Sequence, residues 1–241
     1  MAGNESNSSS RPLLLGHRGL RHCGLRRRFS APPGENSIAA FESALSQGCD
    51  GFEFDVRHTR DGRNVLWHDP EFRGRRIATS DFSQLADRDG STLASLEEVL
   101  EQFGHRAYLD IELKVAGHED AVVAALRKRP PLRAYLVSSF LPEALLRLHE
   151  IDDQLPLGYI CERRSLMDRW RDLPIEVVLP REDLLRPDLV EEAHGLGIKV
   201  MTWTVNSARR MRQLAEWGVD GLISDDPQVL FRTLGAGSKR E

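Results

Sequence analysis

The fold is decided by residues 176–225, EVVLPREDLLRPDLVEEAHGLGIKVMTWTVNSARRMRQLAEWGVDGLISD. Within this stretch, three short runs of mainly β-branched and aliphatic residues begin at Glu176, Ile198 and Asp220, at intervals of 22 residues. A helical pattern fills each gap between them. Strands that alternate with helices at this spacing are typical of a parallel sheet covered by helices.

The same alternation continues toward the N-terminus. Five further strand-like runs begin near Leu13, Gly51, Ala107, Ala134 and Pro156. The helical patterns cover residues 37–47, 95–103, 118–128, 142–151, 165–171, 187–196, 207–217 and 227–234. The shortest, 165–171, has the weakest helical pattern. Eight strands alternating with helices predict a (β/α)8 barrel, with a short cap insertion between strands two and three. A doubly wound sheet is the alternative, but no GxGxxG turn follows the first strand.

The composition predicts one barrel domain with polar ends. Residues 1–12 and 235–241 are polar and rich in small residues, so we expect them to be disordered tails of a domain that spans residues 13–234. The N-terminal segment has no apolar core like that of a secretion signal. The three cysteines are far apart and form no CxxC pair, which is typical of reduced thiols in the cytoplasm, where we expect the protein to be.

The charge balance narrows the possible partners. The chain has 33 basic and 37 acidic residues, a net charge of −4, whereas a dedicated nucleic-acid-binding protein normally has a basic excess. We therefore expect no nucleic-acid partner. No apolar run approaches the length of about 18 residues that a membrane-spanning helix needs, so we expect no stable membrane insertion. The sequence sets no oligomeric state.

Polar side chains lie where the predicted strands end, which is the end that carries the chemistry in such barrels. In GFEFDV, residues 51–56, Glu53 and Asp55 are two positions apart and share one face of the strand, while Phe52 and Phe54 share the other. We expect the aromatic face to pack under the helices. Both carboxylates would then point into the mouth of the barrel.

The next strand adds a third acid to this mouth. Glu112 and Lys114 share one face of YLDIELK, residues 108–114. Like charges that point inward are costly without a countercharge, and a divalent cation held by Glu53, Asp55 and Glu112 would supply it. All-oxygen ligation favours Mg²⁺ or Ca²⁺. The alternative is that these acids pair with arginines at the rim of the barrel.

Two histidines follow apolar strands, and each has a charged neighbour, in His17-Arg18 and His68-Asp69. A single histidine at a strand end is more often a hydrogen-bonded spectator. Two of them beside three carboxylates fit a general base and a general acid better. The last two predicted strands also end in polar residues, Asn206 in one and Ser224 and Asp225 in the other.

Six motifs together resemble one known family, the glycerophosphodiester phosphodiesterases, and in particular its compact bacterial cytoplasmic members. The resemblance covers nearly the whole chain from Leu13 to about Leu230. The motifs are HRG (17–19), ENSIAAFESALSQGCDGFEFDVRHTRDGRNVLWHD (35–69), LDIELK (109–114), LVSSF (136–140), TWTVN (202–206) and GVDGLISDDP (218–227).

The resemblance implies a metal-dependent barrel hydrolase of lipid and glycerol metabolism that cleaves glycerophosphodiesters to glycerol 3-phosphate and an alcohol. In this family the 2-hydroxyl of glycerol can act as the nucleophile, giving a cyclic phosphate that water then opens. The roles implied by position are general base for His17, general acid for His68, metal ligands for Glu53, Asp55 and Glu112, phosphate binding for Arg18 and Lys114, a pocket wall for Trp203, and bracing of the HRG loop for Glu35 and Asn36.

The chain departs from the family pattern in two places. Fifteen residues, 20–34, separate HRG from Glu35, and Gly34 stands where the family usually has proline. This insertion contains Arg26, Arg27 and Arg28, which are either solvated surface or a source of positive potential beside the phosphate site. The cap segment, residues 70–106, is short, which suggests an open pocket.

Two other functions are weighed against this interpretation. A phospholipase D-like enzyme acting on a lysolipid or sphingolipid headgroup would need an apolar rim, and only Phe29 and Phe72 suggest one. A non-catalytic barrel that binds phosphodiesters would be expected to have lost a histidine or an acid, and all five are present.

Overall fold

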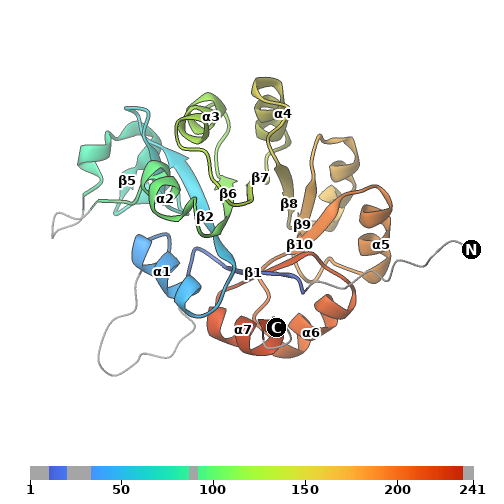
Figure 1. Ribbon diagram of the computed structural model, residues 1–241. Helices are drawn as coiled ribbons and strands as arrows, with labels where there is room; N and C mark the ends of the chain where they lie inside the picture. The colour runs from blue at the N-terminus through green and yellow to red at the C-terminus, as the bar shows by residue number, and fades with distance from the viewer. Residues whose placement is uncertain (1–10, 21–33, 87–91, 236–241) are drawn as a thin grey trace, which may run out of the picture.

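The computed structural model describes residues 11–20, 34–86 and 92–235, and its centre is a barrel of parallel strands ringed by helices (Figure 1). The barrel strands are β1 (Leu13–Gly16), β2 (Gly51–His58), β6 (Tyr108–Leu113), β7 (Tyr135–Ser139), β8 (Leu157–Cys161), β9 (Val177–Pro180), β10 (Lys199–Thr202) and β11 (Gly221–Ser224). β1 pairs in parallel with both β2 and β11, so the barrel is closed. The predicted (β/α)8 fold is confirmed.

Helices connect successive barrel strands, and most of them lie within one or two residues of their predicted bounds. The α-helices are α1 (Ile38–Ser46), α2 (Leu96–Phe103), α3 (Glu119–Lys128), α4 (Pro142–Ile151), α5 (Pro187–Gly195), α6 (Ala208–Glu216) and α7 (Pro227–Leu234). The weakest prediction, 165–171, corresponds to a 3₁₀ helix, η3 (Arg164–Asp172). This segment buries only Trp170 fully, so it has little apolar face to stabilise an α-helix.

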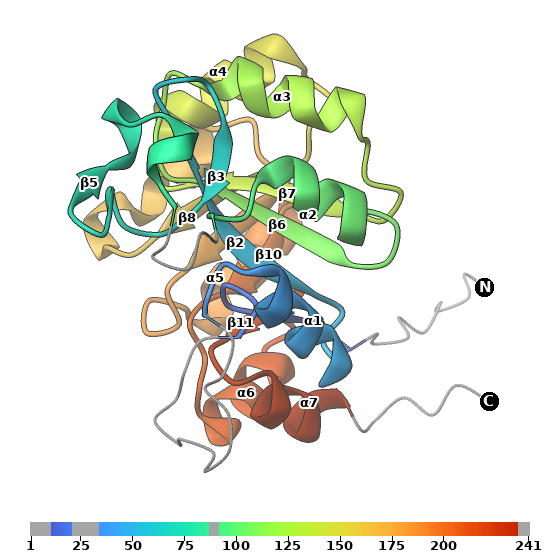
Figure 2. The same cartoon turned by 90° about the vertical axis from the view of Figure 1, so that its left-hand side faces the viewer.

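The cap insertion lies between β2 and β6. β3 (Asn64–Leu66) pairs antiparallel with the end of β2, so that it extends the sheet beyond the barrel (Figure 2). The remaining cap elements are β4 (Glu71–Phe72), β5 (Arg75–Arg76) and the short 3₁₀ helices η1 (Ile77–Thr79) and η2 (Phe82–Gln84). A separate apolar cluster supports them, formed by Val65, Phe72, Ile77, Leu85 and Leu93.

Most of the expected tails, residues 1–10 and 236–241, lie outside the described residues. Arg11, which the sequence assigns to the N-terminal tail, is part of the described structure. Its guanidinium forms an ion pair with Asp50 at 2.7 Å, just before β2 begins. Residues 21–33 of the predicted insertion 20–34, which include its arginines and Phe29, also lie outside the described residues.

An aromatic cluster packs the outer face of β2 against its helices. The rings of Phe52 on β2 and Phe41 on α1 stack with centroids 4.2 Å apart, and Phe103 on α2 meets Phe52 edge-on at 5.1 Å. All three side chains are fully buried. Because side chains alternate along a strand, anchoring Phe52 outward forces Glu53 and Asp55 inward.

The inside of the barrel is divided into two halves. The strands on one side contribute an apolar cluster, which consists of Leu15, Leu136, Ile160, Val177, Leu179, Met201 and Ile223. β2 and β6 instead direct buried acids inward, Glu53 and Asp55 from one and Asp110 and Glu112 from the other. The apolar half therefore forms a low-dielectric wall facing a set of like charges.

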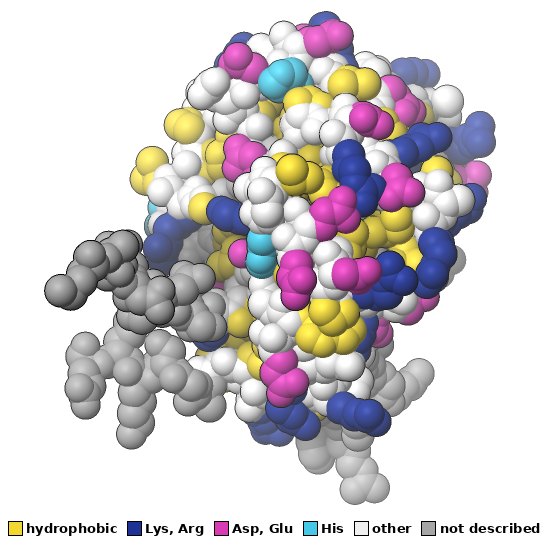
Figure 3. Space-filling model, turned by 90° about the vertical axis from the view of Figure 1, so that its right-hand side faces the viewer, with side chains coloured by type: hydrophobic (Ala, Val, Ile, Leu, Met, Phe, Trp, Pro, Cys, Tyr) yellow, Lys and Arg dark blue, Asp and Glu magenta, His cyan; other side chains and the backbone are white. Residues whose placement is uncertain are grey.

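The surface is mixed in character. On the face shown in Figure 3, lysine and arginine side chains lie interspersed with aspartate and glutamate. Within the described part of the chain, no helix has both the length and the apolar character that crossing a bilayer requires.

The aromatic cluster gives a test of the packing. We expect Phe52→Ala to lower the free energy of unfolding by about 3–5 kcal/mol, because it leaves a cavity between β2 and two helices. Leu132→Ala, whose side chain is 80% exposed, should change it by less than about 0.5 kcal/mol. Urea unfolding measures both, and similar losses for the two variants would contradict this account of the core.

Candidate active site

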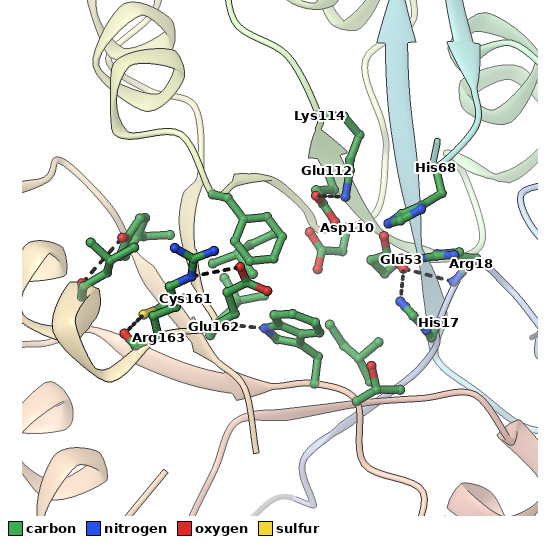
Figure 4. A pocket seen from close by; sticks show the side chains of 18 residues that line it. His17, Arg18, Glu53, His68, Asp110, Glu112, Lys114, Cys161, Glu162 and Arg163 are labelled. Carbon is green, nitrogen blue, oxygen red and sulfur yellow. Dashed lines mark hydrogen bonds and ion pairs between the residues drawn. The ribbon is translucent and has the colours of Figure 1, made fainter. Parts of the chain in front are cut away.

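The candidate site is a cavity of about 380 Å³ at the carboxyl ends of the barrel strands. His17, Arg18, Glu53 and His68 gather on one side of it, and Cys161, Glu162 and Arg163 lie on the opposite side (Figure 4). Seven of the ten residues proposed from the sequence line the cavity: His17, Arg18, Glu53, His68, Glu112, Lys114 and Trp203. The other three, Glu35, Asn36 and Asp55, contact these residues or one another, as described below.

The three predicted metal ligands come together on two neighbouring strands. Asp55 on β2 is paired in register with Glu112 on β6. One carboxylate oxygen from each of Glu53, Asp55 and Glu112 lies within 4.8 Å of the others, in the only such group of candidate ligands among the described residues. Their exposed fractions are 3%, 1% and 7%.

Burial and mutual repulsion make this cluster electrostatically unfavourable. Burial, followed by repulsion from Asp55 and Glu112, raises the pKa of Glu53 well above its usual value. Burial also raises the pKa of Glu112 to about 7. Burial acts in the same direction on Asp55, but the charges of Lys114 and Arg18 outweigh it and lower the pKa of that carboxyl.

A cation fits this donor set. Glu53 Oε1 is buried and accepts no hydrogen bond from the described residues. An orphaned carboxylate oxygen beside two more carboxylates is an arrangement that a hard divalent ion would satisfy, because such ions prefer oxygen ligands. Glu53, Asp55 and Glu112 could therefore hold Mg²⁺ or Ca²⁺.

The HRG turn brings a backbone donor and a guanidinium to the acids. Arg18 has a φ of 52°, and its N–H donates to Glu53 Oε2 at 2.9 Å. Its guanidinium lies 3.1 Å from Asp55 Oδ2 and donates to Glu35 Oε1 at 2.7 Å. A non-glycine residue in the left-handed region is uncommon and is often found at functional sites.

Asn36 braces the same turn from the next segment. Its Nδ2 donates to Asp55 Oδ2 at 2.7 Å, and its Oδ1 accepts the N–H of Asp55 at 3.1 Å. Its N–H donates to the carbonyl of Arg18 at 3.0 Å. Asn36 therefore ties the HRG turn to a candidate metal ligand. These contacts support the bracing role of Glu35 and Asn36, which stays a prediction.

Lys114 is the second cation beside the acids. Its Nζ lies 2.6 Å from Glu112 Oε1 and 3.3 Å from Asp55 Oδ1. Burial opposes its charge, but these two carboxylates outweigh burial and raise the pKa of Lys114. The ammonium also lies 5.5 Å from the centre of the Phe140 ring. A fixed positive charge thus borders the cavity.

His17 and His68 approach the acids from different segments. His17 follows β1, with Nε2 3.8 Å from Glu53 Oε2 and Nδ1 2.6 Å from Asp225 Oδ1. His68 follows β3, with Nδ1 2.7 Å from Asp69 Oδ1. Burial, assisted by the positive charges of Arg18 and Lys114, lowers the pKa of His68.

An apolar wall faces these charges. The indole Nε1 of Trp203 donates to the carbonyl of Leu179 at 2.9 Å, which fixes the ring. The ring of Phe140 meets it edge-on at 5.3 Å. Tyr159 and Leu166 continue the lining. The cavity therefore combines a strongly charged side with a wall of aromatic and aliphatic side chains, as small-molecule sites often do.

Sequence reasoning missed several residues of the site. Asp110 shares a strand face with Glu112, and Arg57 shares one with Asp55, so the same alternation could have identified both. Asp110 is fully buried, accepts a hydrogen bond from Ser138 at 2.6 Å, and has its pKa raised to about 7 by burial. Arg57 donates from Nε to the carbonyl of His68 at 2.8 Å.

Glu162 and Arg163 were missed for a different reason. They follow β8 in a loop that has no recognisable motif, and they reach the cavity through the path of that loop. Their side chains form an ion pair at 3.5 Å (Figure 4).

Comparison with known proteins identifies the chain's relatives. Residues 17–229 match the model of the glycerophosphoryl diester phosphodiesterase family. A glycerophosphodiester phosphodiesterase of Caldanaerobacter subterraneus is 29% identical over 84% of this chain and 93% of the relative. One from Bacillus subtilis is 24% identical over 93% of this chain and 87% of the relative.

Solved structures agree with these matches. An Oleispira antarctica phosphodiesterase, in complex with the product sn-glycerol-3-phosphate, superposes with a TM-score of 0.78 at 25% identity, covering 92% of this chain and 96% of that one. A glycerophosphodiester phosphodiesterase from Parabacteroides distasonis shares the fold, with a TM-score of 0.81 at 22% identity and coverage of 95% and 99%.

The repulsion between the acids predicts how the site responds to a cation. Glu53→Gln removes one buried charge, and its amide can donate to the neighbouring carboxylates, so we expect a Tm in chelator equal to or above that of the unmodified protein. Addition of Mg²⁺ or Ca²⁺ should raise the Tm of the unmodified protein, by the equivalent of about 2.7 kcal/mol at 100 times Kd. The variant should lose this rise.

Glu191→Gln on α5 is the matched control, because its side chain is exposed and does not line the cavity. It should retain the full response to the cation in a thermal melt. A cation-dependent rise in Glu53→Gln equal to that of the control would show that the three carboxylates are not the binding site.

Proposed function

The chain belongs to the glycerophosphoryl diester phosphodiesterase family, and from this premise we propose that it hydrolyses glycerophosphodiesters to glycerol 3-phosphate and an alcohol. The observation that carries the proposal is a cluster of three buried carboxylates, two of which line one cavity together with two histidines, Arg18 and Lys114. The complex of the Oleispira antarctica relative with sn-glycerol-3-phosphate supports the same product here. A cytoplasmic location is part of the proposal, because the motifs resemble those of compact cytoplasmic members of the family.

Glu53, Asp55 and Glu112 would hold one divalent cation, Mg²⁺ or Ca²⁺. When bound, the cation stabilises the negative charge that grows on the phosphate oxygens during attack. Arg18 and Lys114 border the same cavity and supply fixed positive charges for those oxygens. The contacts of Arg18 and Lys114 with Asp55 hold both side chains in place before substrate arrives, so little reorganisation is required.

The histidines move the protons. In the first step the 2-hydroxyl oxygen of glycerol attacks phosphorus, His17 takes the hydroxyl proton, and protonated His68 gives a proton to the departing alcohol oxygen. In the second step water attacks the cyclic phosphate, His68 takes a proton from that water, and His17 returns its proton to the 2-oxygen of glycerol. One water is consumed, and both histidines regain their starting state.

His68 needs to be protonated at the start of this sequence. In the free chain, burial and the neighbouring cations lower its pKa. A bound phosphodiester carries a negative charge that opposes the effect of Arg18 and Lys114. Substrate binding therefore favours the imidazolium form that the first step uses.

The structure offers little support for the other candidates. Phe72, one of two residues considered for an apolar rim, is only 8% exposed and packs edge-on against Trp67 inside the cap at 5.0 Å. The cavity volume of about 380 Å³ is near the lower end of the range, roughly 300–1,000 Å³, that small-molecule sites occupy. Both observations favour a deacylated diester over a lysolipid.

The direct test is release of glycerol 3-phosphate from a panel of glycerophosphodiesters with choline, ethanolamine, glycerol or inositol as the alcohol. We expect turnover with added Mg²⁺ or Ca²⁺ and none in chelator, because the developing phosphate charge then lacks its countercharge. Choline release from a lysolipid should be far slower. Activity that survives exhaustive chelation would contradict the role of the three acids.

The two histidines should differ in their dependence on the leaving group. We expect His68→Ala to slow the cleavage of glycerophosphocholine by about 10²–10⁴-fold, because its alkoxide needs a proton. The same variant should slow an aryl phosphodiester by less than about 10-fold, because phenolate leaves unaided. His17→Ala should impair both substrates, since it activates the nucleophile.

His105→Ala, a change at an exposed histidine outside the cavity, is the control and should leave both rates unchanged. Steady-state kinetics on the two substrates measure the effect. Equal losses for His68→Ala on both substrates would rule out its assignment as the general acid.

A further inference from the structure

His17 is the first member of a chain of hydrogen bonds that reaches two other strand ends. Its Nδ1 lies 2.6 Å from Oδ1 of Asp225, which follows β11. The other carboxylate oxygen, Oδ2, accepts a hydrogen bond at 2.7 Å from Nδ2 of Asn206, which follows β10. Neither Asp225 nor Asn206 lines the cavity. These two residues therefore reach the chemistry through His17.

The orientation of the Asn206 amide is determined by its surroundings. Its Oδ1 lies 2.9 Å from the backbone N–H of Asp225 and 3.1 Å from the hydroxyl of Ser224. A backbone N–H can only donate, so the atom facing it has to be the amide oxygen. The Nδ2 group then faces Asp225 and donates to it.

This orientation determines where the proton of neutral His17 resides. The Asp225 carboxylate only accepts, so the imidazole nitrogen at 2.6 Å carries the hydrogen, which is Nδ1–H. Nε2 is left with its lone pair, on the side of Glu53 and the cavity, at 3.8 Å from Glu53 Oε2. An imidazole with this tautomer can accept a proton at Nε2.

We propose that Asp225, held by Asn206, is the positioning residue that fixes the reactive tautomer and the ring orientation of His17. The inference rests on the proposed role of His17 as the base. The side chains of Asp225 and His17 are only 15% and 10% exposed, so water competes weakly for their contact. A buried carboxylate that orients an imidazole in this way is a recurring arrangement in hydrolases.

A merely structural role would have the same contacts, since they also join the ends of β1, β10 and β11. The test therefore needs a variant that keeps the shape of the side chain at position 225 and reverses the direction of its hydrogen bond to His17. Asp225→Asn does so. The Nδ2 group of Asn206 requires an acceptor, so the new amide at position 225 turns its oxygen toward Asn206 and its NH₂ toward Nδ1 of His17.

His17 would then accept at Nδ1 and carry its proton on Nε2, where it cannot act as a base. We expect kcat to fall by about 10²–10⁴-fold, equally for glycerophosphocholine and for an aryl phosphodiester. KM and the affinity for glycerol 3-phosphate should change by less than about threefold, because neither residue lines the cavity.

The double variant Asp225→Asn/Asn206→Asp exchanges the two side chains and supplies a rescue. One oxygen of the carboxylate at position 206 accepts from the backbone N–H of residue 225 and from the Ser224 hydroxyl. Its other oxygen accepts from the NH₂ group of the new amide at position 225. The amide oxygen at 225 then faces Nδ1 of His17 and restores Nδ1–H. We expect the kcat of the double variant to be at least tenfold higher than that of Asp225→Asn.

Proton NMR reports the tautomer independently of turnover. The unmodified protein should show a downfield resonance from Nδ1–H of His17 that is absent in His17→Ala and in Asp225→Asn and returns in the double variant. Thermal melts of all four proteins check folding. Retained activity in Asp225→Asn, or a double variant no more active than the single one, would overturn the inference. An active His17→Ala would instead overturn the assignment of the base on which it rests.

Discussion

The burial of like charges on two adjacent strands is the constraint on which the rest of this site depends. Glu53, Asp55 and Glu112 are each less than 10% exposed, and their oxygens lie within 4.8 Å of one another. Such a cluster is tolerated only where countercharges and hydrogen-bond donors surround it. Arg18 and Lys114 fill part of that requirement, and a divalent cation would fill the remainder.

The same constraint organises the surrounding chain. Arg18 adopts a left-handed conformation and donates its backbone N–H to Glu53, and Asn36 accepts from and donates to Asp55. Arg57, on the inward face of the same strand, holds the segment that carries His68. Groups that stabilise the acids, such as Arg18 and Asn36, therefore also hold the turn that follows His17.

The two halves of the barrel interior have complementary roles. The apolar half, with Leu179 and Ile223 in its cluster, lowers the local dielectric, which strengthens each charge interaction across the cavity. The acidic half supplies those charges. Trp203 packs against the apolar half, with its indole hydrogen-bonded to the carbonyl of Leu179 and its ring in the cavity wall. This division gives a phosphodiester a charged side and a non-polar side to bind.

Features that depend on residues close together in the sequence could be predicted from the sequence alone. Alternation along GFEFDV places Glu53 and Asp55 on one face, the spacing of apolar runs predicts eight strands, and the positions of both histidines after apolar strands mark them as candidates. Alternation also contains the signal for Asp110 and Arg57. The contact of Asp225 with His17, 208 positions away, and its orientation by Asn206 arise only in the folded barrel. Closing the barrel places β11 beside β1, and that closure comes from strand pairing over the whole circumference, which no local pattern encodes.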